Sequence, residues 1–110
     1  MAEPRRVKVE GDYFHGRVPA GSVYVGRAAP GLPRSPYANP WIPGKNVPDV
    51  ETAVERYRTK LLLDPAFAAA AAQDLAGKNL ACWCDGTPCH ADELLAVVVA
   101  LNEPYEGDPA

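Results

Sequence analysis

The spacing of hydrophobic residues along the chain predicts three short strands. Arg5–Val9 alternates basic and apolar residues, which is typical of a strand with one solvent-facing side. Ser22–Val25 is β-branched and aromatic, and a glycine follows it. Asn79–Cys84 is a short, largely apolar run that indicates a buried strand.

Three helices are predicted in the second half of the chain. Asp49 is a suitable N-cap, and apolar residues then recur at helical spacing, at Val50, Ala53, Val54, Tyr57 and Leu61. Asp64-Pro65 is a second helix start, which leads into an alanine run that Gly77 ends. A third helix is predicted from about Cys89 to about Leu101, with one apolar face made by Leu94, Val97, Val98 and Leu101.

A long loop separates the second strand from the first helix. Residues 26–48 hold six of the 12 prolines, which exclude a helix and a central strand there. A strand followed by helices and another strand favours a parallel βαβ-type crossover between Val23–Val25 and Leu80–Trp83. We therefore expect a small single-domain α/β fold over residues 1–110, with its core at about 5–101 and a frayed acidic tail at 102–110.

Composition narrows the class of protein. The chain of 110 residues is 47% hydrophobic and 23% charged, which is typical of a globular domain and excludes a disordered polar tail. No apolar run is long enough to span a membrane, and the first ten residues lack the apolar stretch of a secretory signal. The three cysteines lie within eight residues, so they are not expected to form a disulfide framework. We therefore expect a reducing, cytoplasmic setting.

Charge is distributed unevenly along the chain. Residues 1–48 hold seven Lys and Arg against three Asp and Glu, whereas residues 49–110 hold four against eleven. Such asymmetry is found where one face binds anions, and also where two halves neutralise each other in the fold. The sequence pI of about 5.3 argues against tight binding to nucleic acid.

Two polar clusters are expected at one edge of the predicted sheet. Ligands of open α/β sheets bind beyond the carboxyl ends of the strands. Arg27 directly follows the second strand and is placed to clamp a phosphate or carboxylate, and Arg34 and Asn39 lie further along the same loop. Cys84 follows the third strand and begins the turn into the last helix.

The segment from Cys82 to His90 holds three thiols and one imidazole. Cys89 and His90 stand at a predicted helix start, where the dipole favours a thiolate and anions, and Asp92 in the first turn is positioned to orient His90. Zinc is the alternative ligand, held by Cys82, Cys84, Cys89 and His90. Cysteines are also common core residues, above all on an apolar strand such as that of Cys82.

Four segments of the chain together resemble a known family. They are Val23–Arg27, Asn39–Trp41, Gly77–Cys84 and Cys89–Leu95. The pattern is similar to that of DUF4326, a domain of unknown function common in phages and actinobacteria. Ala38 and Trp41 stand where this family usually has glycine and phenylalanine, and the segment Pro30–Pro36 is longer than usual.

The resemblance implies a shared site but no activity. It groups Arg27, Asn39, Pro40, Cys84, Cys89, His90 and Asp92 into one pattern. The leading hypothesis is a cytoplasmic protein, without a cofactor, whose Cys/His/Arg site binds an anionic small molecule. The expected ligand is a nucleotide or nucleoside derivative, and transfer or hydrolysis is the expected reaction if the protein is an enzyme. In that reaction Cys89 is the candidate nucleophile, His90 the acid–base group and Asp92 its orienter. The alternative is a zinc-binding structural or interaction module.

Overall fold

The computed structural model describes residues 4–83 and 89–102. In chain order the elements are β1 (Arg6–Lys8), the 3₁₀ helix η1 (Tyr13–His15), β2 (Ser22–Tyr24), α1 (Val50–Leu63), α2 (Pro65–Asp74), β3 (Asn79–Cys82) and α3 (His90–Asn102). The small α/β fold predicted from the sequence is thus confirmed, with three strands and three α-helices in the described part.

The three strands form one parallel sheet in the order β1-β3-β2. Val23 of β2 is in register with Leu80 of β3, so the predicted crossover joins these two strands. Leu80 is also the partner of Arg6 on the other side, which makes β3 the central strand. Because all strands run the same way, their carboxyl ends meet at one edge of the sheet.

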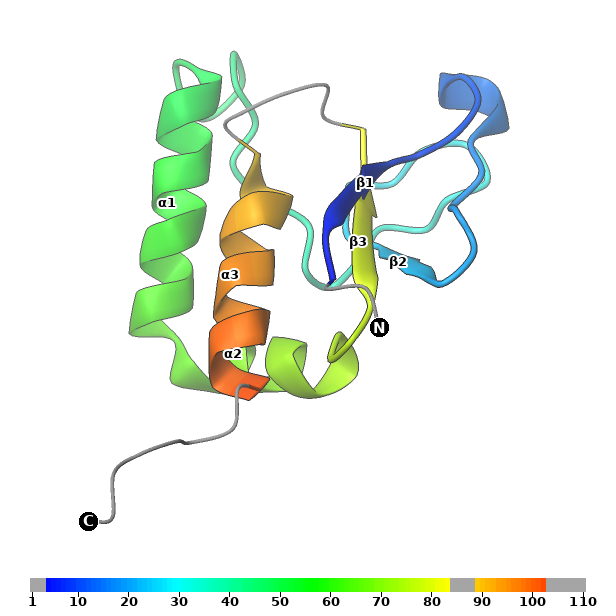
Figure 1. Ribbon diagram of the computed structural model, residues 1–110. Coiled ribbons are helices and arrows are strands. Elements are labelled where there is room, and N and C mark those ends of the chain that lie inside the picture. Colours follow the sequence, from blue (N-terminus) through cyan, green and yellow to red (C-terminus); the bar gives the residue numbers. More distant parts are fainter. Residues whose placement is uncertain (1–3, 84–88, 103–110) are drawn as a thin grey trace, which may run out of the picture.

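Helices cover one face of the sheet. In Figure 1, α1 and α3 stand side by side against the sheet, and α2 lies across their lower ends. The core between them includes Leu80 and Cys82 from β3, Tyr57 from α1 and Leu94 and Val98 from α3. Leu101, predicted on the same face, is 56% exposed because α3 has passed the end of the core at its last turn.

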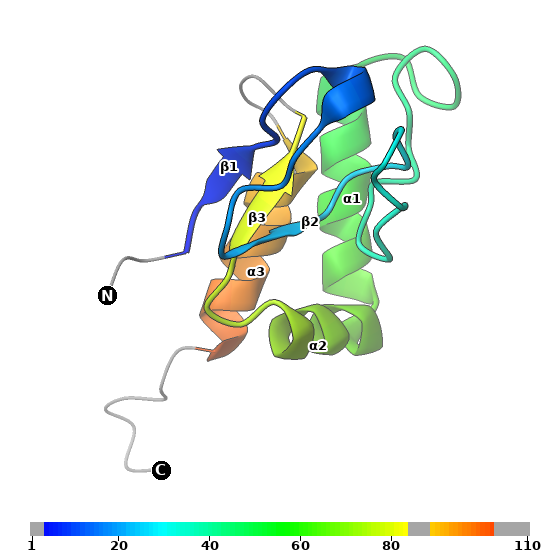
Figure 2. The same cartoon turned by 90° about the vertical axis from the view of Figure 1, so that its right-hand side faces the viewer.

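Loop residues cover the opposite face of the sheet. Side chains alternate along a strand, so Ala81 points away from the helices into a second apolar cluster. Val9 and Leu32 complete the buried part of that cluster, and Trp83 packs against it. In Figure 2, η1 lies above the upper end of β3 and the cyan loop lies beside β2, with the helices behind.

Capping residues set the helix boundaries that the sequence predicted. The Asp49 carboxylate accepts from the backbone N–H of Thr52 at 2.7 Å and starts α1. Asp64 ends α1 and caps α2, with Pro65 at its first position. Asn102, predicted as the first residue of a frayed tail, instead belongs to α3 and donates to the carbonyl of Ala72 at 2.8 Å, while the rest of that predicted tail, 103–110, lies outside the described residues.

Candidate functional site

A cavity lies where the carboxyl ends of β2 and β3 meet the start of α3. Its volume is about 380 Å³. Its walls come from four separate parts of the chain: Tyr13 from η1, Tyr24, Gly26, Arg27, Ala28 and Ala29 around the end of β2, Cys82 and Trp83 at the end of β3, and His90 from the start of α3. We call it the rim cavity. The sequence predicted that Arg27 and His90 share one edge of the sheet, and the fold brings both to this cavity.

His90 is held in one orientation by the end of β2. Its Nε2 lies 2.8 Å from the backbone carbonyl oxygen of Val25, and its ring meets the ring of Tyr57 edge to face at 5.0 Å. A carbonyl only accepts hydrogen bonds, so Nε2 carries the proton. The neutral ring then has its lone pair on Nδ1, which makes His90 a base at that atom.

Arg27 is an exposed cation at the mouth of the rim cavity. Its backbone carbonyl accepts a hydrogen bond from the Tyr24 hydroxyl at 2.5 Å, which fixes the main chain there. Within residues 4–83 and 89–102, the guanidinium forms no ion pair. A guanidinium in such a position can receive a phosphate or carboxylate through two parallel hydrogen bonds.

Aromatic residues that the sequence did not single out as ligand contacts form much of the cavity wall. The rings of Tyr13 and Trp83 lie 6.0 Å apart at 47°. Gly16 makes room for Trp83, because a Cβ at that position would lie 2.8 Å from the indole ring. The indole N–H of Trp83 is buried beside the Tyr24 hydroxyl. Burial raises the pKa of that hydroxyl, and its hydrogen bond with the indole partly offsets the rise. The run Tyr13-Phe14 beside a glycine-rich connection was the only sequence signal for this wall.

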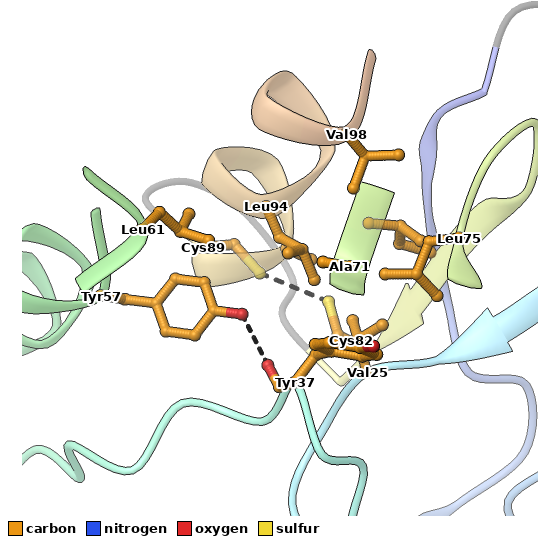
Figure 3. Packing of buried hydrophobic residues seen from close by; sticks show 12 residues of the cluster. Val25, Tyr37, Tyr57, Leu61, Ala71, Leu75, Cys82, Cys89, Leu94 and Val98 are labelled. Atoms are coloured by element: carbon orange, nitrogen blue, oxygen red, sulfur yellow. Dashed lines mark hydrogen bonds between the residues drawn. The ribbon is translucent and has the colours of Figure 1, made fainter. Parts of the chain in front are cut away.

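Cys82 and Cys89 bring their sulfur atoms together beneath the cavity. The two Sγ atoms are 3.3 Å apart, and the side chains are 1% and 2% exposed (Figure 3). Cys82 is a core residue, as the apolar strand indicated, and it also lines the cavity. Cys89 lies in the same core cluster, so its predicted role as nucleophile has no support from contact with the cavity surface.

Asp92 pairs with β1. Its Oδ1 lies 3.3 Å from Nε of Arg6, across the junction between β1 and α3. Burial raises the pKa of the Asp92 carboxyl above its ordinary value, although the Arg6 cation opposes the shift. The pKa of Arg6 is lowered by burial, but the Cys89 thiol and the Asp92 carboxylate outweigh this and raise it overall. His90 is oriented by the hydrogen bond that its Nε2–H donates to the Val25 carbonyl.

The remaining predicted site residues lie elsewhere. The Asn39 amide is buried and bridges two backbone groups, donating to Ala53 O at 3.1 Å and accepting from Trp41 N–H at 3.0 Å. Arg34 is exposed and lines a separate hollow beside Tyr37 and Asp74. Cys84 lies outside the described residues.

Two kinds of site are not found in the part of the chain that the structure describes. No group of three His, Cys, Asp or Glu side chains there is arranged to hold a metal ion. None of the helices there has the length and apolar content that a membrane span needs.

Comparison with other proteins agrees with the sequence motifs. The family model of the domain of unknown function DUF4326 matches residues 13–100, which include every residue of the rim cavity. Neither curated proteins nor solved structures gave a significant match. The family match spans well over half of the chain and confirms the resemblance of its motifs, and the chain therefore belongs to the DUF4326 family.

Proposed function

We propose that the rim cavity binds an anionic small molecule, namely a nucleotide or a nucleoside derivative. The observation that carries the proposal is the meeting of an exposed guanidinium, three aromatic side chains and an imidazole around one cavity. Its volume of about 380 Å³ falls in the range of small-molecule sites. The carboxyl edge of a parallel sheet is also where α/β proteins hold such ligands.

Each wall matches one part of the proposed ligand. The Arg27 guanidinium supplies charge and a planar pair of donors for a phosphate. The faces of Tyr13 and Trp83 suit a planar base, because aromatic rings stack on nucleobases of any identity.

His90 supports a chemical step on the bound molecule. With Nε2–H held by the Val25 carbonyl, Nδ1 is the atom that accepts a proton from a water or hydroxyl nucleophile. Hydrolysis or group transfer is the reaction class that such a base serves. We place this function in the cytoplasm, the setting that three cysteines within eight residues favour over a dispersed disulfide framework.

Tryptophan fluorescence tests the binding proposal directly. Trp41 and Trp83 are the two tryptophans, and Trp41→Phe leaves Trp83 as the sole reporter. Adenosine 5′-monophosphate and uridine 5′-monophosphate serve as probes, with adenosine and inorganic phosphate as their separate parts. We expect saturable quenching by a monophosphate, and weaker binding of adenosine. No saturable change with any of the four probes would contradict the proposal.

Two charge-removing variants sharpen this test. Arg27→Gln is expected to weaken monophosphate binding about tenfold, since a hydrogen bond to a charged group contributes roughly 1.5–3 kcal/mol. Adenosine binding should change little. Lys45→Gln removes a charge from an exposed position of the same loop, outside the cavity, and should bind like the parent chain. Equal losses in the two variants would mean that general charge, and not Arg27, attracts the anion.

Zinc binding is the second candidate function, and the Cys82–Cys89 contact favours it. Two sulfur atoms 3.3 Å apart are close enough to share one ion. This candidate predicts about one zinc per purified chain, and loss of the folded state when a chelator removes it. Metal analysis that finds no zinc would eliminate it.

A further inference from the structure

The two thiols beneath the rim cavity are arranged for chemistry with each other. Cys82 ends β3 and Cys89 immediately precedes α3, and their sulfur atoms are 3.3 Å apart (Figure 3). A disulfide bond has an S–S length of about 2.05 Å. An approach of roughly 1.3 Å therefore separates the present contact from a covalent bond.

We propose that Cys82 and Cys89 are a modification site, a thiol pair that hydrogen peroxide converts to a disulfide. The Cys82 sulfur, on the cavity side of the pair, attacks one peroxide oxygen, the O–O bond breaks, and the thiol proton leaves with the other oxygen as water. Cys82 is then a sulfenic acid. The Cys89 sulfur attacks it, the S–S bond forms, the S–O bond breaks, and a second water leaves with the Cys89 proton. The two thiols lose two electrons, and peroxide gains them.

Because the two thiols lie next to the rim cavity, peroxide can approach them through it, and a disulfide between them would affect the cavity. Cys82 lines the rim cavity, so a small oxidant in the cavity reaches one side of the pair. On the other side, the Arg6 guanidinium lies beside Cys89. The new bond would join the end of β3 to the residue before His90, whose imidazole shares the cavity wall with Cys82. Oxidation would thus alter the positions of Cys82 and His90 in the wall of the rim cavity.

The test uses the chain alone, so its outcome does not depend on the nucleotide proposal. The Cys84→Ser variant leaves Cys82 and Cys89 as the only cysteines. The reduced variant is treated with hydrogen peroxide, blocked with N-ethylmaleimide under denaturing conditions and weighed by mass spectrometry. We expect a loss of two hydrogen atoms, no maleimide adduct, and two adducts after reduction with dithiothreitol.

Peptide mapping identifies the bond in the unaltered chain. Trypsin leaves all three cysteines in one fragment, because no Lys or Arg follows Lys78. Cleavage before Asp85 separates Cys82 and Cys84 from Cys89. In the oxidised wild-type chain we expect these two peptides to stay joined through Cys82 and Cys89, with maleimide on Cys84. The joined peptides should separate on reduction.

Several outcomes would overturn the proposal. In the Cys84→Ser variant, these are two maleimide adducts after peroxide, a sulfinic acid without a disulfide, or a bond between two chains. In the wild-type chain, a disulfide bond between Cys84 and either Cys82 or Cys89 would also overturn the proposal. One zinc per chain that shields both thiols from peroxide would also overturn it. The double variants Cys82→Ser/Cys84→Ser and Cys84→Ser/Cys89→Ser keep one thiol each, and they show the mass change that unpaired oxidation produces.

Discussion

Gly26 is a single position at which one added carbon would disturb the rim cavity. A Cβ there would lie 2.5 Å from the Tyr24 hydroxyl oxygen and 2.6 Å from its Cζ. The Tyr24 side chain cannot retreat without breaking its hydrogen bond to the Arg27 carbonyl. The absence of a side chain at residue 26 is therefore a requirement of space, and it lets the tyrosine ring pack over the main chain that carries Arg27.

Gly26→Ala is expected to lower the free energy of unfolding by about 1–3 kcal/mol, the usual cost of overpacking. It should also weaken monophosphate binding, because the main chain at Arg27 must shift. Urea unfolding and the fluorescence titration measure the two effects.

Gly21→Ala is the comparison variant for Gly26→Ala, because it strains the backbone conformation without a steric clash. A Cβ at residue 21 meets nothing within 4 Å, but the glycine has a φ of +78°. This variant is expected to lose about 1–2 kcal/mol from its left-handed backbone, with ligand affinity unchanged. The same affinity in both glycine variants would disprove a spatial role for Gly26 in the cavity.

The positions of candidate site residues were predictable from the sequence where they depend on neighbouring elements. Arg27 after a strand and His90 at a helix start were both predicted near the strand ends, and both line the cavity. Asn39 was predicted as a ligand residue, but its amide bridges backbone groups of the loop and α1. The contact of Tyr13 with Trp83 joins residues far apart in sequence, and no local pattern indicates it.

At the scale of elements, Asp64 joins two helices. Its backbone N–H donates to the Lys60 carbonyl and ends α1, and its carboxylate accepts from the Phe67 N–H at 3.1 Å and starts α2. One residue thus satisfies backbone groups of both helices. The corner that it makes turns the chain from α1 into α2 beneath the core (Figure 1).

Asp64→Ala is expected to lower the free energy of unfolding by about 1 kcal/mol, because the first turn of α2 loses its side-chain acceptor. Asp64→Asn keeps an acceptor oxygen and should lose much less. Thermal or urea unfolding of the two variants and the parent chain measures the difference. If asparagine proved as costly as alanine, charge and not capping would explain the effect.

Element type could be predicted more completely than element order. Caps, proline positions and β-branched runs indicated all three α-helices and all three strands, because these signals act over a few residues. The 3₁₀ helix at Tyr13–His15, capped by Asp12, was missed because three residues carry no periodicity. The central place of β3 was also missed, since strand pairing depends on contacts across most of the chain.

At the scale of the whole molecule, two tyrosines link the long loop to the helices. The Tyr57 hydroxyl donates to the Tyr37 carbonyl at 2.7 Å, and the Tyr37 hydroxyl donates to the Asp74 carboxylate at 2.5 Å (Figure 3 shows the first bond). Burial and the Asp74 carboxylate raise the pKa of Tyr37 to about 12. Burial also raises the pKa of Tyr57, and the neighbouring Tyr37 adds to the shift.

These pKa shifts predict a loss of stability in alkali. In the unfolded chain a tyrosine ionises near pH 10, whereas in the folded chain both hydroxyls stay protonated to higher pH. Their contribution is complete below about pH 10 and declines as the pH rises toward the pKa of Tyr37, about 12. Urea unfolding from about pH 8 to about pH 11 should show this decline.

Tyr37→Phe separates the contribution of the Tyr37 hydroxyl to the alkaline loss of stability from that of Tyr57. The variant is expected to be less stable by about 1 kcal/mol at neutral pH, because its hydrogen bond to Asp74 is lost. It should then lose less stability than the parent chain between about pH 10 and about pH 11. A parallel decline in both proteins would show that Tyr37 does not contribute to the alkaline transition.

The central position of β3 has a consequence for how the chain is made. A ribosome releases β1 and β2 first, but these strands do not pair with each other, and in the sheet both pair with Asn79–Cys82. The chain must therefore leave the ribosome as far as β3 before the sheet can begin to form. A nascent chain that stops before residue 79 exposes two strands without their shared partner.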